Sequence, residues 1–223
     1  MIRISQIKLP AEHTKVQLEQ KIKKAVHHAP LKSYQIFKRS LDARKKDQIS
    51  YVYTIDAEIE RESEFLKRNK NPRITKAERK EYRLPRCRKE IPVRPVVIGM
   101  GPAGLFAALI LAKAGLKPIL LERGKPVEER MKDVEAFWES GNLNPESNVQ
   151  FGEGGAGTFS DGKLNTAVKD KYGRNRFVLE TFVKYGAPEE ILYDGKPHIG
   201  TDLLCKVVAN MRNAIQEAGG TIR

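Results

Sequence analysis

Residues 96–104 read Val96-Val97-Ile98-Gly99-Met100-Gly101-Pro102-Ala103-Gly104. The apolar run is typical of a buried strand, and the glycines after it form a Gly-x-Gly-x-x-Gly turn. A helix is expected to follow as far as Gly115, and a second strand from Pro118 to Leu121. Glu122 then stands 18 residues beyond Gly104. This order of strand, glycine turn, helix, strand and acidic residue is the fingerprint of a dinucleotide-binding unit.

Each part of the fingerprint has a mechanical reason. Gly99 permits the tight turn, Gly101 lets the backbone approach a pyrophosphate, and Gly104 lets the helix lie close to the strand. The helix N-terminus at Pro102 and Ala103 would hold the phosphates, and Glu122 would accept hydrogen bonds from an adenosine ribose. The alternative is a strand-helix-strand unit whose glycines serve packing alone. The fingerprint does not by itself separate NAD from FAD.

A second glycine-rich stretch runs from Gly152 to Lys163 and is typical of a loop that brings backbone N–H groups and one cation to an anion. Lys163 would then lie near the developing negative charge of a flavin, or else be a solvated lysine at a turn. Gly157-x-x-x-x-Gly162-Lys163 also has the spacing of a nucleotide-triphosphate P-loop. However, Leu164 replaces the Ser or Thr that would hold magnesium, and no long buried strand leads into the stretch.

These motifs resemble those of known flavoproteins. Gly99-x-Gly101-x-x-Gly104-x-x-x-Ala108, with Gly115 and then Leu121-Glu122-Arg123-Gly124, looks like the FAD-binding motif of the glutathione-reductase-type flavoproteins. Residues 144–166 and Arg39-Ser-Leu-Asp-Ala-Arg-Lys-Lys46 resemble the uncharacterised bacterial FAD-dependent dehydrogenases. The likeness covers essentially the whole chain.

The resemblance implies an FAD-dependent oxidoreductase or an N-terminal fragment of one, with NAD(P) as a conceivable electron donor and an unknown small-molecule substrate. It places Arg130 near the cofactor phosphates. It also implies a protein more than twice as long, so a missing C-terminal half or a second chain would supply the rest. The predicted cofactor-binding residues are Gly99, Gly101, Pro102, Ala103, Gly104, Glu122, Arg123, Arg130, Gly154, Gly155, Ala156, Gly157, Thr158, Ser160 and Lys163.

Catalytic residues are not assigned by the sequence. His198 is able to exchange a proton near neutral pH, but it precedes a predicted helix from Leu203 to Ala218, so capping and turn formation is the favoured role. Thr201 or Asp202 is the expected N-cap of that helix, and Gly219-Gly220 its stop. His13, His27 and His28 lack metal-ligand partners, and no metal site is expected. A further helix is predicted from Val127 to Glu139, with Phe137 and Trp138 packing it.

The first 65 residues predict a basic α+β module of β-α-β-β order. Ile2, Ile4, Ile7 and Leu9 indicate a first strand, and a helix should run from Thr14 to about His27. A second strand starts at Tyr34 and Ile36. Alternation then predicts a third, whose buried face carries Ile49, Tyr51, Tyr53, Ile55, Ala57 and Ile59. The turn between these strands carries Arg44-Lys45-Lys46-Asp47.

The charge is concentrated in the front of the chain. The 223 residues hold 41 Lys and Arg and 28 Asp and Glu, a net charge of +13. Met1 to Arg94 holds 25 basic and 12 acidic residues, whereas Pro95 to Arg223 holds 16 of each. This excess leaves open a nucleic-acid-binding or RNA-modifying flavoprotein, or docking on an acidic protein partner. Against single-strand binding, Tyr51 and Tyr53 share a strand face with apolar residues.

The cysteine spacing and the apolar segments argue against several further classes of protein. Cys87 and Cys205 stand far apart, which argues against a disulfide scaffold, a zinc knuckle and a redox-dithiol enzyme. The first residues lack the apolar core of a signal peptide, and glycines interrupt the apolar stretch from Val96 to Ala112, so a cytoplasmic protein without a membrane span is expected.

The predicted fold class is α/β, with an incomplete Rossmann-like FAD-binding domain after a small α+β module. We expect the module at residues 1–65 and the FAD-binding domain at residues 95–223. Between them, residues 66–94 form a basic linker or irregular arm, with a helical stretch around Ala77 to Tyr82.

Overall fold

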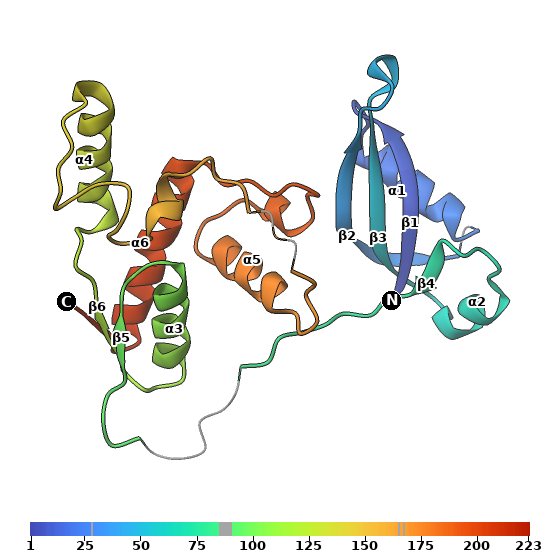
Figure 1. The fold of residues 1–223 in the computed structure, drawn as a ribbon. Coiled ribbons are helices and arrows are strands. Elements are labelled where there is room, and N and C mark those ends of the chain that lie inside the picture. Colours follow the sequence, from blue (N-terminus) through green and yellow to red (C-terminus); the bar gives the residue numbers. More distant parts are fainter. Residues whose placement is uncertain (28, 85–90, 165, 167) are drawn as a thin grey trace. The chain divides into compact units, whose positions relative to one another are not determined.

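The computed structural model describes residues 1–27, 29–84, 91–164, 166 and 168–223. His28, Cys87 and part of the expected linker lie outside the described residues. The chain divides into two compact units, and each is considered by itself (Figure 1). The first is Met1–Glu81 with Glu189–Pro197, and the second is Tyr82–Pro188 with His198–Arg223. The architecture is mixed α/β, with an antiparallel sheet in the first unit and a parallel sheet in the second.

The β-α-β-β order expected of the first unit is confirmed. Its elements are β1 (Ile2–Pro10), α1 (Lys15–Ala25), β2 (Leu31–Asp42) and β3 (Ser50–Ile59), with a short 3₁₀ turn η1 (Lys46–Gln48) in the basic hairpin. Helix α1 begins where Thr14 Oγ1 accepts from the Gln17 N–H and Gln17 Oε1 accepts from the Thr14 N–H. This reciprocal capping satisfies two amide groups that a helix start leaves open. The helix buries Leu18 and Ile22 against one face of the sheet.

The buried face of β3 matches the prediction from Tyr53 onward. Tyr53, Ile55, Ala57 and Ile59 are buried, but Ile49 precedes the strand and is 44% exposed, so its place in the core was predicted wrongly. Ile49 instead ends the 3₁₀ turn η1, and the strand begins at the next residue, Ser50.

Two elements of the first unit were not predicted. Helix α2 (Glu62–Arg68) and strand β4 (Ile74–Lys76) fall within or next to the expected linker, and β4 pairs antiparallel with β1. The sheet order is therefore β2-β3-β1-β4. The helical stretch expected around Ala77 to Tyr82 is wrong, because no helix forms there.

A distant segment completes the first unit. Residues 189–197 contain the 3₁₀ turn η3 (Glu189–Leu192), and the chain after it pairs with the edge of β2. The Arg39 N–H donates to the Tyr193 carbonyl at 2.7 Å, and the Gly195 N–H donates to the Arg39 carbonyl at 2.8 Å. The Arg39 guanidinium also forms a two-bond ion pair with Asp194 at 2.6 and 2.9 Å.

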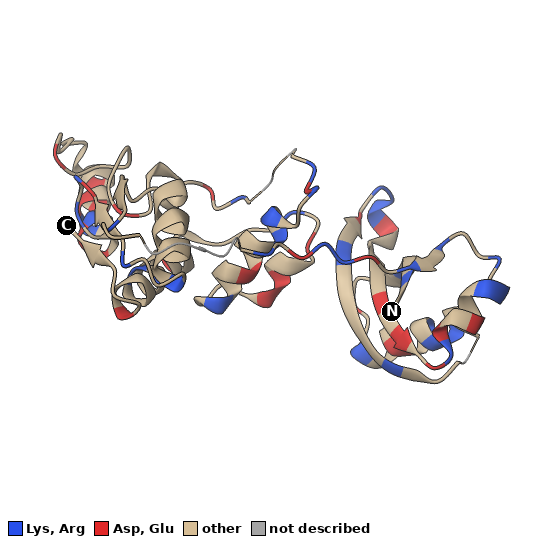
Figure 2. Cartoon of the chain, turned by 90° about the horizontal axis from the view of Figure 1, so that it is seen from below, with Lys and Arg blue, Asp and Glu red and all other residues tan. Residues whose placement is uncertain are grey.

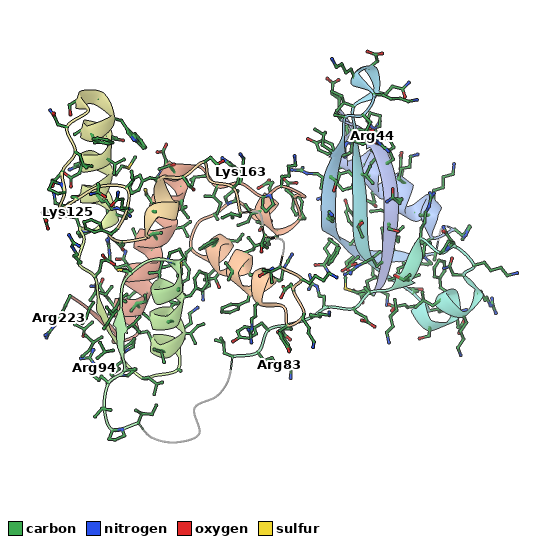
Figure 3. All side chains as sticks on the ribbon, viewed as in Figure 1. Arg44, Arg83, Arg94, Lys125, Lys163 and Arg223 are labelled. Atoms are coloured by element: carbon green, nitrogen blue, oxygen red, sulfur yellow. The ribbon has the colours of Figure 1, made fainter. Side chains whose placement is uncertain are left out.

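The second unit contains the strand, helix and strand expected around the glycine turn. They are β5 (Val96–Ile98), α3 (Pro102–Lys113) and β6 (Ile119–Leu121). The first strand, however, is not buried as predicted, because Val96 and Ile98 are 56% and 84% exposed. The remaining elements are α4 (Val127–Ser140), η2 (Ala156–Phe159), α5 (Arg174–Lys184), α6 (Thr201–Glu217) and β7 (Thr221–Ile222). Both strand pairs are parallel, in the order β5-β6-β7. Arg94 binds the carbonyls of Lys117 and Pro118 and the Thr221 hydroxyl at one end of this sheet (Figure 3).

Two details of the helices differ from the prediction. Gly200, rather than Thr201 or Asp202, is the N-cap of α6, and no side chain caps it. Trp138 is 59% exposed, because the buried face of α4 carries Val127, Arg130 and Val134 instead. Helix α5 was not predicted.

Candidate cofactor site

The glycine turn joins β5 to α3. The Gly99 N–H donates to the Leu121 carbonyl at 2.7 Å, which extends the strand pairing by one residue. Gly99 then takes φ +90°, a conformation that side chains rarely adopt. At Gly104 a Cβ atom would lie 1.8 Å from the Gly99 carbonyl oxygen, so close packing of helix on turn requires glycine there.

Gly101 differs from both of these glycines. Its φ of −71° is open to any residue, and a Cβ atom placed on it would meet no protein atom within 4 Å. Neither conformation nor packing within the described chain therefore requires glycine at this position. Gly101 is the N-cap of α3, and the backbone there is open to whatever approaches the helix N-terminus.

Glu122 fixes the turn from the neighbouring strand. Its Oε2 accepts from the Met100 N–H at 2.5 Å, and its Oε1 accepts from the Gly124 N–H at 2.8 Å. Both carboxylate oxygens therefore hold backbone amides, although each keeps a further lone pair that can accept a bond. The predicted cofactor ligand is thus also a structural residue of the turn.

The structure brings the second glycine loop onto the first turn. The Gly154 N–H donates to the Met100 carbonyl at 2.8 Å. A Cβ atom at Gly155 would lie 3.2 Å from Pro102 Cδ and 3.3 Å from Gly101 Cα. Two stretches of chain more than fifty residues apart therefore meet at the N-terminus of α3.

Arg130 lies behind the second loop rather than on its surface. It has no solvent exposure, and its guanidinium donates to five backbone carbonyls at 2.8–3.5 Å. These carbonyls belong to Asn148, Val149, Gly152, Glu153 and Gly155. Burial lowers the pKa of Arg130, since taking the cation out of water disfavours its charged form. The guanidinium is occupied by the loop in this structure, so its part in the site is to shape the loop.

Glu153 was not predicted as a functional residue and is almost fully buried. Its Oε2 accepts from the Val127 N–H at 2.7 Å, at the start of α4, and from Arg212 at 2.6 Å. Arg212 bridges it to Glu128. The sequence did contain a signal. A carboxylate in a loop that is expected to face an anion would repel that anion, so Glu153 should turn away from it. In the structure Glu153 points inward and binds the Arg212 cation.

The other predicted cofactor-binding residues differ in whether their polar groups are already hydrogen-bonded within the protein. Thr158 is buried, and its Oγ1 has no hydrogen-bond partner within the described part of the chain. The Ser160 hydroxyl donates to the Gly157 carbonyl at 2.7 Å. Arg123 is exposed and stacks on Phe151, with 4.4 Å from Cζ to the ring centre. Ala156 and Gly157 are exposed next to Gly155.

Lys163 lies on the surface of the second unit (Figure 3). Its Nζ pairs with Asp161 at 2.7 Å, and this bond raises the pKa of Lys163. The adjacent Gly162 packs on the backbone of Ile199 and the ring of His198, where a Cβ atom would lie 2.1 Å from the Ile199 carbonyl oxygen and 3.0 Å from His198 Nε2. Gly162 thus has a packing role. The 3₁₀ turn η2 overlaps residues 157–163, and turns and bends rather than a strand lead into them from residue 145, as the missing P-loop features predicted.

The described residues offer no group of three or more His, Cys, Asp or Glu that could hold a metal ion. Cys205 is buried, and burial raises the pKa of its thiol. His198 is exposed just before α6. None of the helices within the described ranges has the length and hydrophobicity that a membrane crossing requires.

Comparison with known proteins gives relatives but no activity. Residues 1–58 match a family described as a domain of unknown function, DUF8436. The chain is also similar to an uncharacterized protein of Clostridium beijerinckii, with 47% identity over 224 residues. That alignment covers 99% of this chain and 42% of the relative, so the chain spans less than half of the relative's length.

Proposed function

We propose that the second unit binds the ADP portion of FAD at the N-terminus of α3, as part of a flavin-dependent oxidoreductase. One observation carries the proposal: Gly101 is a glycine for which neither the backbone conformation nor the surrounding protein gives a reason. A pyrophosphate that contacts the turn would give one, because any side chain at this position would keep it away.

Three further features support a dinucleotide. The parallel order β5-β6-β7, with a helix after each of the first two strands, agrees with one half of a Rossmann-like sheet. The α3 N-terminus begins at Pro102, has no side-chain cap and keeps backbone N–H groups available to phosphate oxygens. The second loop lies against the same turn, where the buried and unpartnered Thr158 hydroxyl is available to a ligand.

In this proposal each residue has a defined task. Gly101, Ala103 and Gly104 contact the pyrophosphate, Glu122 accepts from the ribose, and Arg130 holds the second loop in place. FAD, when bound, supplies two-electron transfer chemistry, while the protein supplies orientation and electrostatics. NAD(P) is proposed as an electron donor, and the whole protein's substrate and catalytic residues are left unassigned. A cytoplasmic location belongs to the same proposal. The proposed cofactor-binding part is the second unit, Tyr82–Pro188 with His198–Arg223, rather than residues 95–223 as predicted from the sequence.

The test compares two helix N-caps. Gly101→Val and Gly200→Val each place a side chain in open space at an uncapped helix start with an ordinary φ. Both should cost the same small amount of helix stability. Only Gly101→Val should lose affinity for FAD and for ADP, by about a hundredfold, since two charge-assisted bonds are lost.

The readouts are the visible spectrum after gel filtration and calorimetric titration of the full chain with FAD, ADP and NAD in turn. Binding of NAD alone would change the cofactor assignment. If neither FAD nor ADP binds the unaltered chain, or if both valine variants weaken binding equally, the proposal is wrong.

A further inference from the structure

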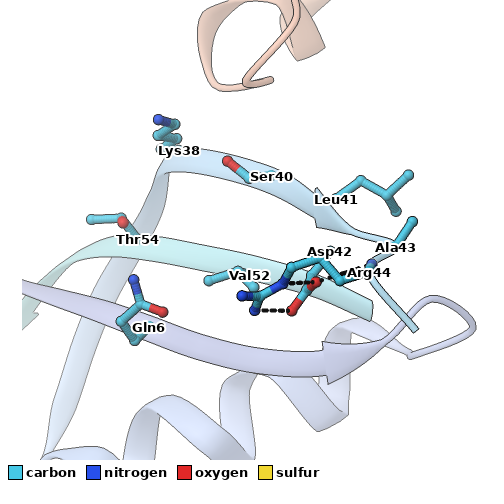
Figure 4. A pocket seen from close by; sticks show the side chains of 9 residues that line it. All are labelled: Gln6, Lys38, Ser40, Leu41, Asp42, Ala43, Arg44, Val52 and Thr54. Atoms are coloured by element: carbon cyan, nitrogen blue, oxygen red, sulfur yellow. Dashed lines mark hydrogen bonds and ion pairs between the residues drawn. The ribbon is translucent and has the colours of Figure 1, made fainter. Parts of the chain in front are cut away.

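The first unit has a sheet face that no helix within the described part of that unit covers. Helix α1 packs on the face that holds Ile55 and Ala57, so alternate residues of β3, such as Val52 and Thr54, point to the opposite face. On that face lies a hollow of about 370 Å³ (Figure 4). It is lined by Gln6, Lys38, Ser40, Leu41, Asp42, Ala43, Arg44, Val52 and Thr54.

A cluster of ion pairs organises one end of the hollow. The Arg44 guanidinium folds back onto Asp42 with two bonds of 2.9 Å, and Lys8 Nζ donates to the same carboxylate at 2.9 Å. These two cations hold the pKa of Asp42 well below its usual range, so the carboxylate stays ionised and holds both cations in position. The Asp42 carboxylate is therefore paired with two cations, Arg44 and Lys8.

The other end of the hollow supplies donors that the protein leaves open. Lys38 forms no ion pair with another residue in the described part of the chain. The Thr54 hydroxyl and the Gln6 amide line the wall beside it. A second hollow of about 530 Å³ adjoins the first and shares Lys38, Ser40, Leu41 and Ala43. Lys196 adds a further positive charge there, whereas Arg39 is paired with Asp194, which lines the same hollow.

We propose that this face binds a phosphate-bearing ligand, with Lys38 as the principal contact. The cations Lys8, Arg44 and Lys38 against the single Asp42 carboxylate leave a local excess of positive charge. The first unit as a whole holds 21 Lys and Arg against 14 Asp and Glu, and its basic residues are spread over the helices, strands and hairpin, so its net charge attracts an anion (Figure 2). An ammonium, a hydroxyl and a side-chain amide are all groups that donate to the oxygens of an anion.

The site is independent of the proposed cofactor site, since its residues all belong to the first unit. Its ligand chemistry has two sources, a free phosphate and the backbone of a nucleic acid. The experiment therefore uses two probes with the full chain. The first is inorganic phosphate, followed by ³¹P NMR line width, and the second is a fluorescein-labelled single-stranded oligouridine, followed by anisotropy over a potassium chloride series.

Lys38→Gln is compared with Lys21→Gln, which removes the same charge from the exposed side of α1. We expect Lys38→Gln to weaken binding of at least one probe about tenfold, as for loss of one charge-assisted bond, and Lys21→Gln to change it less than about twofold. Thr54→Val, which removes one hydroxyl at nearly constant volume, should weaken the same probe more modestly. Circular dichroism checks that each variant folds, and FAD titration should be unchanged in all of them.

The outcome identifies the source. Binding of phosphate that the oligonucleotide does not share supports a small phosphorylated ligand. Oligonucleotide binding that depends on Lys38 and falls with salt supports a nucleic-acid backbone. The proposal is overturned if neither probe binds, or if Lys38→Gln and Lys21→Gln weaken binding to the same extent, because the attraction would then belong to net charge alone.

Discussion

Arg130 carries a positive charge into the interior of the second unit, where backbone carbonyls surround it. Burying a cation is costly unless its donors are satisfied, and here the carbonyl dipoles of residues 148–155 satisfy them. Because a trans peptide directs its N–H opposite to its C=O, the Gly155 carbonyl bonded to Arg130 turns the Ala156 N–H away from the guanidinium. One buried residue therefore sets the direction of several amides in the loop.

Replacement of Arg130 should destabilise the second unit. We expect Arg130→Met to lower the free energy of unfolding by about 3–5 kcal/mol, because five buried carbonyls lose their donor at once. Arg130→Lys should cost less, since an ammonium keeps the charge but reaches fewer carbonyls. Urea denaturation followed by circular dichroism measures both.

Arg123→Met provides the matched control, since that arginine is exposed beside the same loop, and it should change stability by no more than about 0.5 kcal/mol. Hydrogen exchange at residues 152–156 should increase in Arg130→Met alone. Equal stability of Arg130→Met and Arg123→Met would show that the carbonyl contacts do not hold the loop.

Glu153 and Glu128 share Arg212 but should respond to pH with opposite signs. Burial raises the pKa of Glu153 above its ordinary 4.5, so the folded state binds this proton more readily than the unfolded state, and stability falls as pH rises above 4.5. The bond from Arg212 lowers the pKa of Glu128, so its contribution is present above pH 4.5 and is lost as pH falls through the lowered pKa.

Measuring the free energy of unfolding of Glu153→Gln and Glu128→Gln from pH 3 to pH 8 separates the contributions of the two carboxylates. Relative to the unaltered protein, Glu153→Gln should gain stability as pH rises, because it removes a buried charge and keeps an oxygen for the Val127 N–H. Glu128→Gln should lose stability relative to the unaltered protein as pH rises toward 4.5, because only the unaltered protein then gains the ionised Glu128 beside Arg212. The same sign for both variants would contradict this account.

Sequence alone predicted the glycines and Glu122 but not how the residues behind them are arranged. Gly99, Gly101 and Gly104 follow from a local motif whose spacing reflects turn geometry. The contact between Gly154 and Met100, and the inward turns of Arg130 and Glu153, depend on the tertiary packing of α4 and α6. No periodicity encodes such contacts, so Arg130 was expected near the cofactor phosphates and Glu153 was assigned no role.

Strand β1 contains a bulge that its sequence already indicates. Its buried residues step by two from Ile2 to Ile4, by three to Ile7, and by two again to Leu9. The pairing with β3 shifts between Ile4 and Ile7, and Gln6 has φ +63°. The extra residue brings Ile7 and Leu9 back to the helix-covered face, which a strict alternation would not have done.

The bulge makes a prediction at Gln6. Gln6→Ile should lower stability by about 1–2 kcal/mol, because a β-branched residue is strained at positive φ. Gln6→Gly should be neutral or stabilising, since glycine adopts this conformation freely. Thermal unfolding of both variants measures the difference, and an equal loss for Ile and Gly would place the cause in the side-chain contacts of Gln6 rather than in its backbone.

Elements with a strong apolar pattern were predicted, and short ones held by tertiary contacts were not. Strand β3 and helices α1, α3 and α6 each place apolar residues at the period of their structure. Strand β4 has three residues and exists through its pairing with β1. Within α5 only Thr181 is buried, so its apolar residues give little periodic signal.

The whole chain combines a basic first unit with a second unit whose parallel sheet is covered on one face. Leu120 faces the helices and is fully buried, whereas Ile98 on the opposite face is 84% exposed. Val96 and Ile119 are register partners, as are Ile98 and Leu121, so these four residues form one apolar surface. Parallel sheets are ordinarily covered on both faces.

This apolar surface should make the isolated chain associate with itself. Since the chain spans 42% of its relative from Clostridium beijerinckii, further protein chain is available in that relative to cover the corresponding face. We expect concentration-dependent self-association of the 223-residue chain. The double variant Val96→Thr with Ile98→Thr should reduce it, because threonine keeps the β-branched shape while removing apolar surface.

Val16→Thr, at an isolated exposed position on α1, is the control and should leave association unchanged. Sedimentation velocity over a hundredfold concentration range measures the effect; a chain that stays monomeric throughout, or a double variant that associates as strongly as the unaltered protein, would show that this surface does not drive association.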